Sequence, residues 1–279
     1  LQIDFQKGAD PTIPLLSNFQ ITGNVIRGGF HGMNYLLNGV QHLNVQVEGN
    51  TLSEQGEGNN VNYGSGLRVF GTGANDIHLR NFHVDGNTIS QMDGIAPIIM
   101  SLSQTSGDCV LTGVSVSRNT TSGDVGSAGL GTTPYCITFN LGSLVGNTPR
   151  IEGVRIEDNQ IDGAPEDTVR VGVFPPKGIL FTGPPEDTVG EVQNLSVSRN
   201  SAVIYLGQDE AGEGITVDLN NNHSSAAVYK NLKVDENSVV VETEGESGSA
   251  PGVAVGIRIK ATAGLLSASA SRNTIKSGS

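Results

Sequence analysis

A motif that recurs along the whole chain is the feature that most constrains how it folds. Each copy starts with a small or amide residue, alternates apolar and variable residues, and reaches an asparagine six residues after its start. Because eight copies follow one another at a mean spacing of about 36 residues, the sequence predicts a solenoid of stacked coils. The copies begin at Asn18, Asn44, Asn81, Gly113, Gly153, Asn194, Asn231 and Ser267.

Each copy has the pattern of a short β-strand followed by a turn and a second strand. The apolar positions alternate with period two and are mostly β-branched or aromatic, which predicts a strand with one face turned inward. A third strand, opened by glycine in most copies, precedes the motif, and no helical periodicity of useful length occurs. These third strands are expected at 32–35, 66–70, 94–98, 135–139, 178–181, 214–217 and 256–259.

The asparagine that ends each motif is expected at a corner of the coil. Asparagine tolerates the left-handed conformation of a sharp bend, and stacked amides hydrogen-bond along the stack. We therefore predict one ladder, with steps of about 4.8 Å between coils. Its members are Asn24, Asn50, Asn87, Asn119, Asn159, Asn200, Asn237 and Asn273.

In this repeat form the sequence resembles the right-handed parallel β-helix proteins of the pectin-lyase-like superfamily, over nearly the whole chain. The resemblance implies an all-β fold: one right-handed parallel β-helix solenoid domain over residues 1–279, with about seven to eight coils of three short strands. Superfamily members include polysaccharide lyases, glycoside hydrolases, uronan epimerases, phage tailspikes and bacterial adhesins. The resemblance thus implies a polysaccharide partner and an extracellular, cell-surface or virion location, and leaves the activity open.

Charge and hydropathy exclude two classes of partner. A net charge of −12 with only 16 basic residues argues against binding nucleic acid through its phosphates. No apolar run approaches the roughly 18 residues of a membrane span. A solenoid also leaves open coil ends, so we expect a fragment of a larger protein whose neighbouring domain covers them; a homotrimer is the weaker alternative.

The chain shows no cofactor motif and no spaced set of metal ligands. Its two cysteines, Cys109 and Cys136, stand at different distances before the ladder asparagines, so we expect free thiols. An acidic turn is nearly duplicated at 165–169 and 185–189, each reading Pro-Glu-Asp-Thr-Val. These turns either contribute oxygens to Ca²⁺ or are solvated turns that begin with proline. The longest insertions fall between the ladder asparagine and the next glycine-led strand, and predict a wall of loops.

Two rows of outward-facing residues are candidates for binding. The row between the inward apolar positions is a mostly neutral, hydrogen-bonding stripe: Gln20, Gln46, His83, Ser115, Arg155, Ser196, Lys233 and Ser269. We select Gln46, Arg155 and Lys233 from it as candidate substrate-binding residues. The glycine-led strands present Asn34, Arg68, Ala96, Thr138, Leu180, Thr216 and Arg258. Neither row contains the paired carboxylates of a glycosidase.

Histidines concentrate in the first three coils and suggest a catalytic cluster. His78 and His83, with Arg68, Arg80 and Asp85, would supply the base and the carboxylate-neutralising group of a lyase or epimerase. The alternative is that these are ordinary surface histidines.

Two functions stay open from the sequence. One is a module that recognises a polysaccharide, either with or without cleaving it, of the lyase, hydrolase or tailspike type; the other is a non-catalytic structural or adhesin spacer. The segment 256–260, Gly-Ile-Arg-Ile-Lys, resembles a substrate-binding motif of polygalacturonases, but the acidic pairs of that family are missing and the repeat itself accounts for the segment. The absence of tryptophan removes the ring most used to stack on sugars.

Overall fold

The structure is a computed structural model, and it describes most of the chain. The described residues are 1–6, 15–55, 64–71, 76–92, 96–104, 108–125, 135–144, 149–162, 177–184, 190–206, 212–219, 228–243, 254–261 and 267–277. Within them, all regular secondary structure is β-strand, arranged in three sheets that we call A, B and C. No helix among these residues is long and apolar enough to cross a membrane.

Among the described residues, sheets A and C have eight strands each, and sheet B has thirteen. Sheet A contains β1 (Gln2–Gln6), β5 (His31–Asn38), β8 (Ser65–Gly71), β11 (Ala96–Gln104), β15 (Tyr135–Leu144), β19 (Lys177–Thr182), β23 (Gly212–Asp218) and β27 (Ala254–Lys260). Sheet C contains β4 (Val25–Arg27), β7 (Thr51–Gln55), β10 (Thr88–Met92), β14 (Thr120–Val125), β18 (Gln160–Asp162), β22 (Ser201–Leu206), β26 (Ser238–Thr243) and β29 (Thr274–Ser277). Sheet B contains β2 (Leu15–Ser17), β3 (Gln20–Thr22), β6 (Gln41–Glu48), β9 (Ile77–Asp85), β12 (Cys109–Thr112), β13 (Ser115–Ser117), β16 (Arg150–Glu152), β17 (Arg155–Glu157), β20 (Glu191–Gln193), β21 (Ser196–Ser198), β24 (Val228–Lys230), β25 (Leu232–Asp235) and β28 (Ala268–Ser271).

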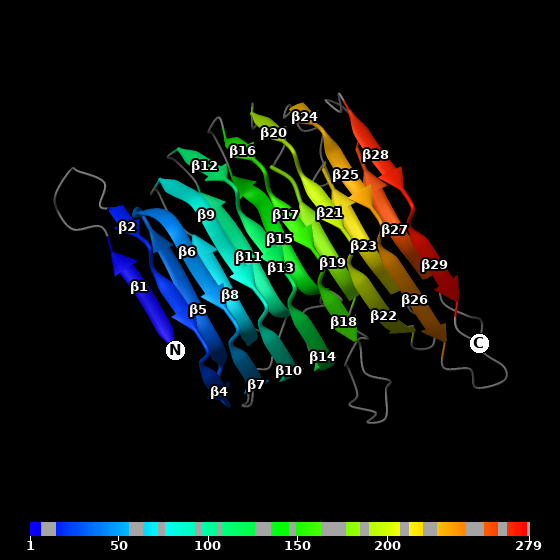
Figure 1. Cartoon of the computed structure of the whole chain (residues 1–279), viewed down its shortest axis with the longest axis horizontal. Helices are drawn as coiled ribbons and strands as arrows, with labels where there is room; N and C mark the ends of the chain where they lie inside the picture. Colours follow the sequence, from blue (N-terminus) through cyan, green and yellow to red (C-terminus); the bar gives the residue numbers. More distant parts are fainter. Residues whose placement is uncertain are drawn as a thin grey trace.

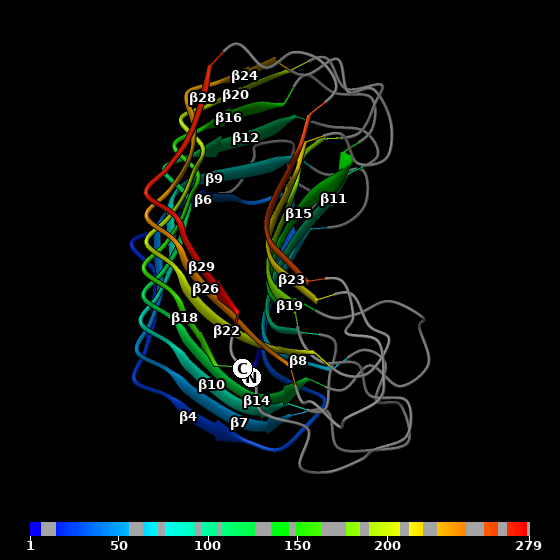
Figure 2. The ribbon, with the colours of Figure 1, turned by 90° about the vertical axis from the view of Figure 1, so that its right-hand side faces the viewer.

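The chain passes through sheets A, B and C in turn and then starts the next coil. Equivalent strands of successive coils pair in parallel; β8, for example, pairs with β5 on one side and β11 on the other. The coils stack from the N-terminal to the C-terminal end (Figure 1), and sheet A lies opposite sheets B and C (Figure 2). The protein is an all-β parallel β-helix, as the repeat predicted.

The inward positions of all three sheets fill the interior. Leu79, Phe82 and Ile156 are inaccessible to solvent, and the rings of Phe139 and Phe181 stack with their centroids 5.7 Å apart. Burying these side chains is the main driving force for stacking the coils. Both cysteines are buried free thiols, Cys109 in β12 of sheet B and Cys136 in β15 of sheet A, as predicted.

The predicted asparagine ladder runs along the corner between sheets B and C. Each side-chain Nδ2 donates to Oδ1 of the asparagine in the next coil, at 2.8 to 3.0 Å. From Asn50 onward, Nδ2 also donates to a backbone carbonyl of the preceding coil, as from Asn159 to Val116 at 2.9 Å. The ladder is confirmed, and its central members are buried.

The predicted reason for asparagine at this corner is wrong in one respect. The left-handed residue is the one before each ladder asparagine, for example Gly49 (φ 64°) or Asp158 (φ 57°), and no ladder asparagine has a positive φ. The amide is needed there for its hydrogen bonds, because it replaces backbone partners that the bend removes.

A second bend, within sheet B, carries an exposed amide ladder that the sequence analysis missed. The residue that starts each of the first seven motifs is left-handed, as at Asn44 (φ 54°), and Nδ2 of Asn44 donates to Oδ1 of Asn18 at 3.0 Å. Asn81 continues this ladder toward Asn44 at 3.0 Å, and Asn231 joins Asn194 at 3.1 Å. Between Asn81 and Asn194 the bend positions are the glycines Gly113 and Gly153.

One predicted strand is out of register. Pairing aligns Ala96 with Ser65 and Ile99 with Arg68, so Ile99 takes the outward place predicted for Ala96, which is buried. The reason is that Pro97, and not Gly94, lies opposite Gly66, where the backbones approach closely; a Cβ on Gly66 would meet the Pro97 carbonyl oxygen at 2.7 Å. The duplicated acidic turns proposed for Ca²⁺ lie outside the described residues, as do the longest insertions.

Candidate functional site

The predicted polar stripe on sheet B is one continuous row. Each member is the register partner of the next, through the pairs Gln20–Gln46, Gln46–His83, His83–Ser115, Ser115–Arg155, Arg155–Ser196, Ser196–Lys233 and Lys233–Ser269. The candidate substrate-binding residues Gln46, Arg155 and Lys233 therefore lie on one line along the helix axis. Adjacent members are about 4.8 Å apart, the spacing of paired strands.

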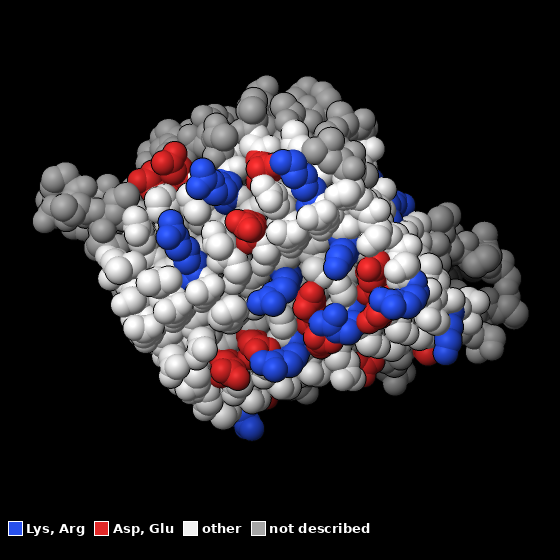
Figure 3. Space-filling view, turned by 45° about the horizontal axis from the view of Figure 1, so that its top comes forward, with Lys and Arg blue, Asp and Glu red and all other residues white. Residues whose placement is uncertain are grey.

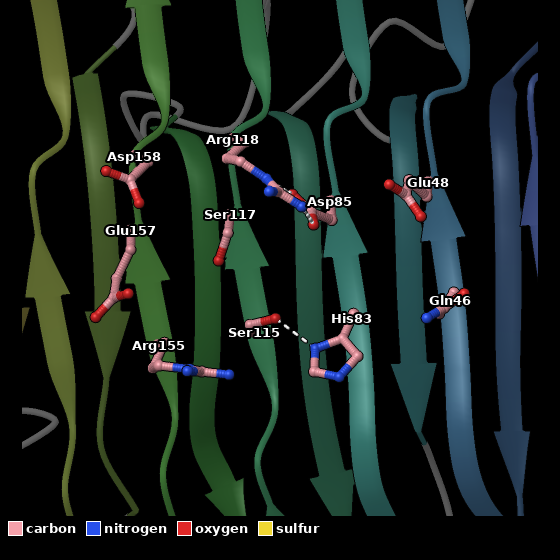
Figure 4. Close-up of a pocket in the computed structure, with 10 residues that line it drawn as sticks. All are labelled: Gln46, Glu48, His83, Asp85, Ser115, Ser117, Arg118, Arg155, Glu157 and Asp158. Atoms are coloured by element: carbon pink, nitrogen blue, oxygen red, sulfur yellow. Dashed lines mark hydrogen bonds and ion pairs between the residues drawn. The ribbon is translucent and has the colours of Figure 1, made fainter.

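This row forms the floor of a hollow of about 490 Å³ over β6, β9, β13 and β17. Figure 4 shows Gln46, His83, Ser115 and Arg155 side by side across these strands. One wall consists of the next outward residues along each strand: Glu48, Asp85, Ser117 and Glu157, with Arg118 and Asp158 beyond them. Acidic and basic side chains are interspersed on this face of the molecule (Figure 3).

A second hollow of about 440 Å³ continues the first toward the C-terminal end. It shares Arg155 and Glu157 with the first hollow and extends across Ser196 to Lys233. We call the two together the sheet-B groove. The groove crosses the strands, so a linear molecule lying in it would meet one coil after another.

His83 is the group in the groove best suited to act as a base. Its Nδ1 lies 2.7 Å from Oγ of Ser115. Burial lowers the pKa of His83, Arg155 lowers it further, and Asp85 and Glu48 partly oppose this. The imidazole is therefore neutral at pH 7, and in Figure 4 its second ring nitrogen points away from Ser115.

Three carboxylates of the groove are paired with arginines. Asp85 forms an ion pair with Arg118, and Arg199 binds Glu157 at 3.0 Å and Asp158 at 2.8 Å. Glu48 and Glu157 were not among the predicted candidates, because those came only from the position between the inward apolar residues. The same period-two pattern would have located them two residues further on.

The structure brings together only part of the predicted catalytic cluster. His83 and Asp85 line the groove. His78 and Arg80 share the outer face of β9 but precede its bend at Asn81, and they line neither hollow.

Arg68 lies in another sheet. On β8 of sheet A, its Nη1 is 3.5 Å from Nε2 of His31, and its guanidinium lies 3.9 Å from the ring centroid of Phe70. It therefore does not join His83 and Asp85 in the groove.

Sheet A carries a second cluster of charged groups, centred on Glu213. Arg258 approaches its carboxylate to 2.5 Å, Lys177 to 3.6 Å, and Thr216 donates a hydrogen bond at 3.1 Å. Burial alone would raise the pKa of Glu213, but the hydrogen bond from Tyr135 and the two cations lower it overall.

The cations of the Arg-Ile-Lys segment are both engaged within the protein. Arg258 pairs with Glu213, and Lys260 pairs with Asp218 at 3.0 Å. Both carboxylates belong to β23, the strand beside the segment. These pairs tie neighbouring coils together, which supports the view that the repeat explains the segment.

The described residues contain no group of three or more histidine, cysteine, aspartate or glutamate side chains placed to hold a metal ion. Comparison with protein families, with curated proteins and with solved structures finds no match to this chain.

Proposed function

We propose that this protein is a β-helix module, of the pectin-lyase-like type and located outside the cell or on a virion surface, that recognises a polysaccharide along the sheet-B groove. The observation that carries the proposal is the unbroken polar row from Gln46 to Lys233 on the floor of two joined hollows. Its hydrogen-bonding groups recur at the spacing of the coils. A linear polymer of sugars offers hydroxyl groups with a matching periodic repeat.

The chemistry of the groove also supports recognition of a polar ligand. Amide, hydroxyl, imidazole and guanidinium groups line it, and no phenylalanine or tyrosine ring of the described residues does. Such a surface binds through directional hydrogen bonds, which fix orientation more than they add affinity. We therefore expect a modest affinity for each sugar and a strong dependence on polymer length.

Cleavage is the finer part of the proposal. His83 would remove a proton from a sugar carbon next to a carboxylate, and Arg155 would stabilise the negative charge that develops. This is β-elimination: His83 takes the proton, the glycosidic C–O bond breaks, the departing oxygen takes a proton from water, and a carbon–carbon double bond forms in the sugar.

The test is a screen of neutral and acidic glycans for binding, for new reducing ends and for unsaturated uronate. We expect Arg155→Ala to weaken binding about tenfold, as for a lost charge-assisted hydrogen bond. Arg150→Ala is the matched control, because Arg150 is exposed on β16 of the same sheet and lines neither hollow. Equal losses in both variants would contradict a role for the groove.

Cleavage has its own pair of variants. His83→Ala should abolish formation of unsaturated uronate, whereas His78→Ala, on the same strand and outside the groove, should not. Binding without product would support recognition and reject the lyase.

A rigid spacer is the second candidate function. The buried ladder and the stacked ion pairs along its corner stiffen the solenoid without any ligand. A negative result with every glycan in the screen would favour this function.

A further inference from the structure

The exposed amide ladder on sheet B is interrupted next to the unpaired cations of the groove. Asn18, Asn44 and Asn81 form its first part, and Asn194 and Asn231 form its last part. In the two intervening coils the bend residues are Gly113 and Gly153, and both line the second hollow. The missing side chains open a notch there.

The break leaves hydrogen-bonding capacity at the edge of the notch. Along the ladder, Nδ2 of each asparagine donates to Oδ1 of the preceding one, as from Asn231 to Asn194. Because Oδ1 of Asn194 accepts from Asn231 in the following coil, its Nδ2 lies on the side of the preceding coil, where Gly153 has no side chain to accept from it. Asn194 therefore keeps an amide donor beside the second hollow, which it lines.

Two cations in this hollow lack an anionic partner. Arg118, Arg199, Lys230 and Lys260 each form an ion pair with a carboxylate. Among the described residues, neither Arg155 nor Lys233 forms an ion pair or a side-chain hydrogen bond, although both line the second hollow. The nearest carboxylate on the strand of Arg155, Glu157, is bound by Arg199 at 3.0 Å.

The two cations are spaced by the strands of the sheet. Arg155 is the register partner of Ser196, and Ser196 is the partner of Lys233. Two strand spacings separate them, which is about 9.6 Å. Two successive sugars of an extended chain span a length of the same order.

From these contacts we infer that the notch is a subsite for the carboxylate of an acidic sugar, and that the glycan carries such a group on every second sugar. This inference rests on the proposed function and names its substrate class. One carboxylate would bind Arg155 and Nδ2 of Asn194, and the next would bind Lys233. Guanidinium and ammonium groups each form charge-assisted hydrogen bonds with carboxylates.

The net charge of −12 does not oppose this assignment. At physiological ionic strength, charges further apart than about 8 Å are largely screened, so the local cations dominate. A polymer with a carboxylate on every sugar would instead place its middle charge at Ser196, which is uncharged.

Gly153→Asn tests the notch without removing a cation. The bend at Gly153 has φ 69°, close to the 52° to 56° that asparagine adopts at the equivalent positions 18, 44, 81, 194 and 231. A Cβ there would meet Gly113 N at 3.6 Å, an ordinary contact. The variant should fold normally, because its amide rejoins Asn194.

The experiment measures binding of an oligosaccharide with glucuronate on every second sugar, and of the same oligosaccharide with its carboxyl groups reduced to alcohols. Gly153→Asn and the double variant Arg155→Ala/Lys233→Ala should each weaken binding of the acidic form about tenfold or more, and should remove the preference over the reduced form. Asn44→Gly, which opens the same ladder away from both cations, should leave both affinities unchanged. An unaltered preference in both test variants would overturn the subsite while leaving the proposed function intact.

A small-ligand titration separates the two failures. Sodium glucuronate should shift the side-chain amide resonance of Asn194 in the wild-type protein but not in Gly153→Asn. If no glycan binds but this shift occurs, the notch is an anion site and the proposed polysaccharide function is wrong. If glucuronate leaves the Asn194 amide unmoved, the subsite is wrong.

Discussion

Two stretches of the ladder corner adopt the same backbone conformation with different side chains. In the N-terminal coils the left-handed residue is Gly23, Gly49 or Gly86, with φ between 61° and 68°. In the later coils it is charged, with φ between 53° and 59°, and the charge alternates in sign. Those later residues are Arg118, Asp158, Arg199, Glu236 and Arg272.

The comparison shows two ways to stabilise one bend. Glycine adopts this conformation freely, whereas any other residue in it destabilises the folded state by about 1 kcal/mol. Alternation lets neighbouring coils pair, as Arg199 does with Asp158 at 2.8 Å and Arg272 with Glu236. An exposed ion pair stabilises the fold by about 0.5 kcal/mol, so glycine and a paired charged residue at this position differ little in free energy. They differ in their response to salt and to substitution.

The largest effect is expected from the ladder that both stretches share. Asn159→Leu removes two donated and two accepted hydrogen bonds, and leaves the backbone N–H of Asn119 and one of its two side-chain N–H groups without an acceptor. At about 1 kcal/mol each, the free energy of unfolding should fall by about 4 kcal/mol in urea titrations. Asn24→Leu, at the half-buried end of the ladder, is the control and should cost less; equal losses would show that ladder position does not matter.

The second largest effect is expected from acid, which should destabilise the N-terminal coils. Burial lowers the pKa of His42 to about 4, and its Nδ1 lies 2.9 Å from the hydroxyl of Tyr35. Because the unfolded imidazole titrates near 6.5, its contribution is complete above pH 6.5 and is lost as pH falls toward 4. The wild-type protein should lose about 3 kcal/mol over this range through His42. His31, with a pKa also lowered to about 4, acts in the same direction.

The measurement compares urea unfolding of the wild-type protein and His42→Gln at several pH values. Glutamine keeps a hydrogen-bonding group beside Tyr35 but does not titrate. The difference between the two free energies should shrink toward acid pH. Parallel curves would show that His42 does not make these coils acid-sensitive.

Exchanging glycine and a charged residue at the left-handed position should have a smaller effect on stability. Gly86→Arg places a cation next to Arg118 of the following coil in a left-handed conformation, and should cost about 1 kcal/mol. Arg118→Gly loses an exposed ion pair but relieves the backbone, and should change stability by less than about 0.5 kcal/mol. Thermal unfolding of both variants gives the comparison, and a large loss in Arg118→Gly would mean that the ion pair outweighs the strain.

Salt should produce the smallest difference between the stretches. At about 1 M salt, where screening acts beyond about 3 Å, the later coils with charged corner residues should lose a few tenths of a kcal/mol of stability for each exposed ion pair. Hydrogen exchange should therefore quicken at Arg199 N, which donates to the Asp235 carbonyl, and not at Gly49 N, which donates to the Asp85 carbonyl. Uniform quickening would contradict a local effect.

Much of the candidate site was predictable because strand periodicity and stacking are local rules applied repeatedly. The row from Gln46 through His83 and Arg155 to Lys233 followed from the position of each residue between two inward neighbours. Arg68 was grouped with His83 because both lie in the first three coils, although the repeat places them on different strands. How the side chains of two different strands of a coil lie relative to each other is set by the turns between them, and these put Arg68 in sheet A and His83 in sheet B.

The sequence by itself determined the repeat, the inward faces, the amide ladder and the polar row, because each depends on residue type at a fixed period. Only the tertiary structure decided which charged groups meet, since pairs such as Arg199 with Glu157 join coils 42 residues apart. It also decided that Pro97, and not Gly94, lies opposite Gly66, because backbone contact between coils sets the register. The second hollow likewise lies where two glycines, Gly113 and Gly153, occupy the bend positions that asparagines occupy in other coils.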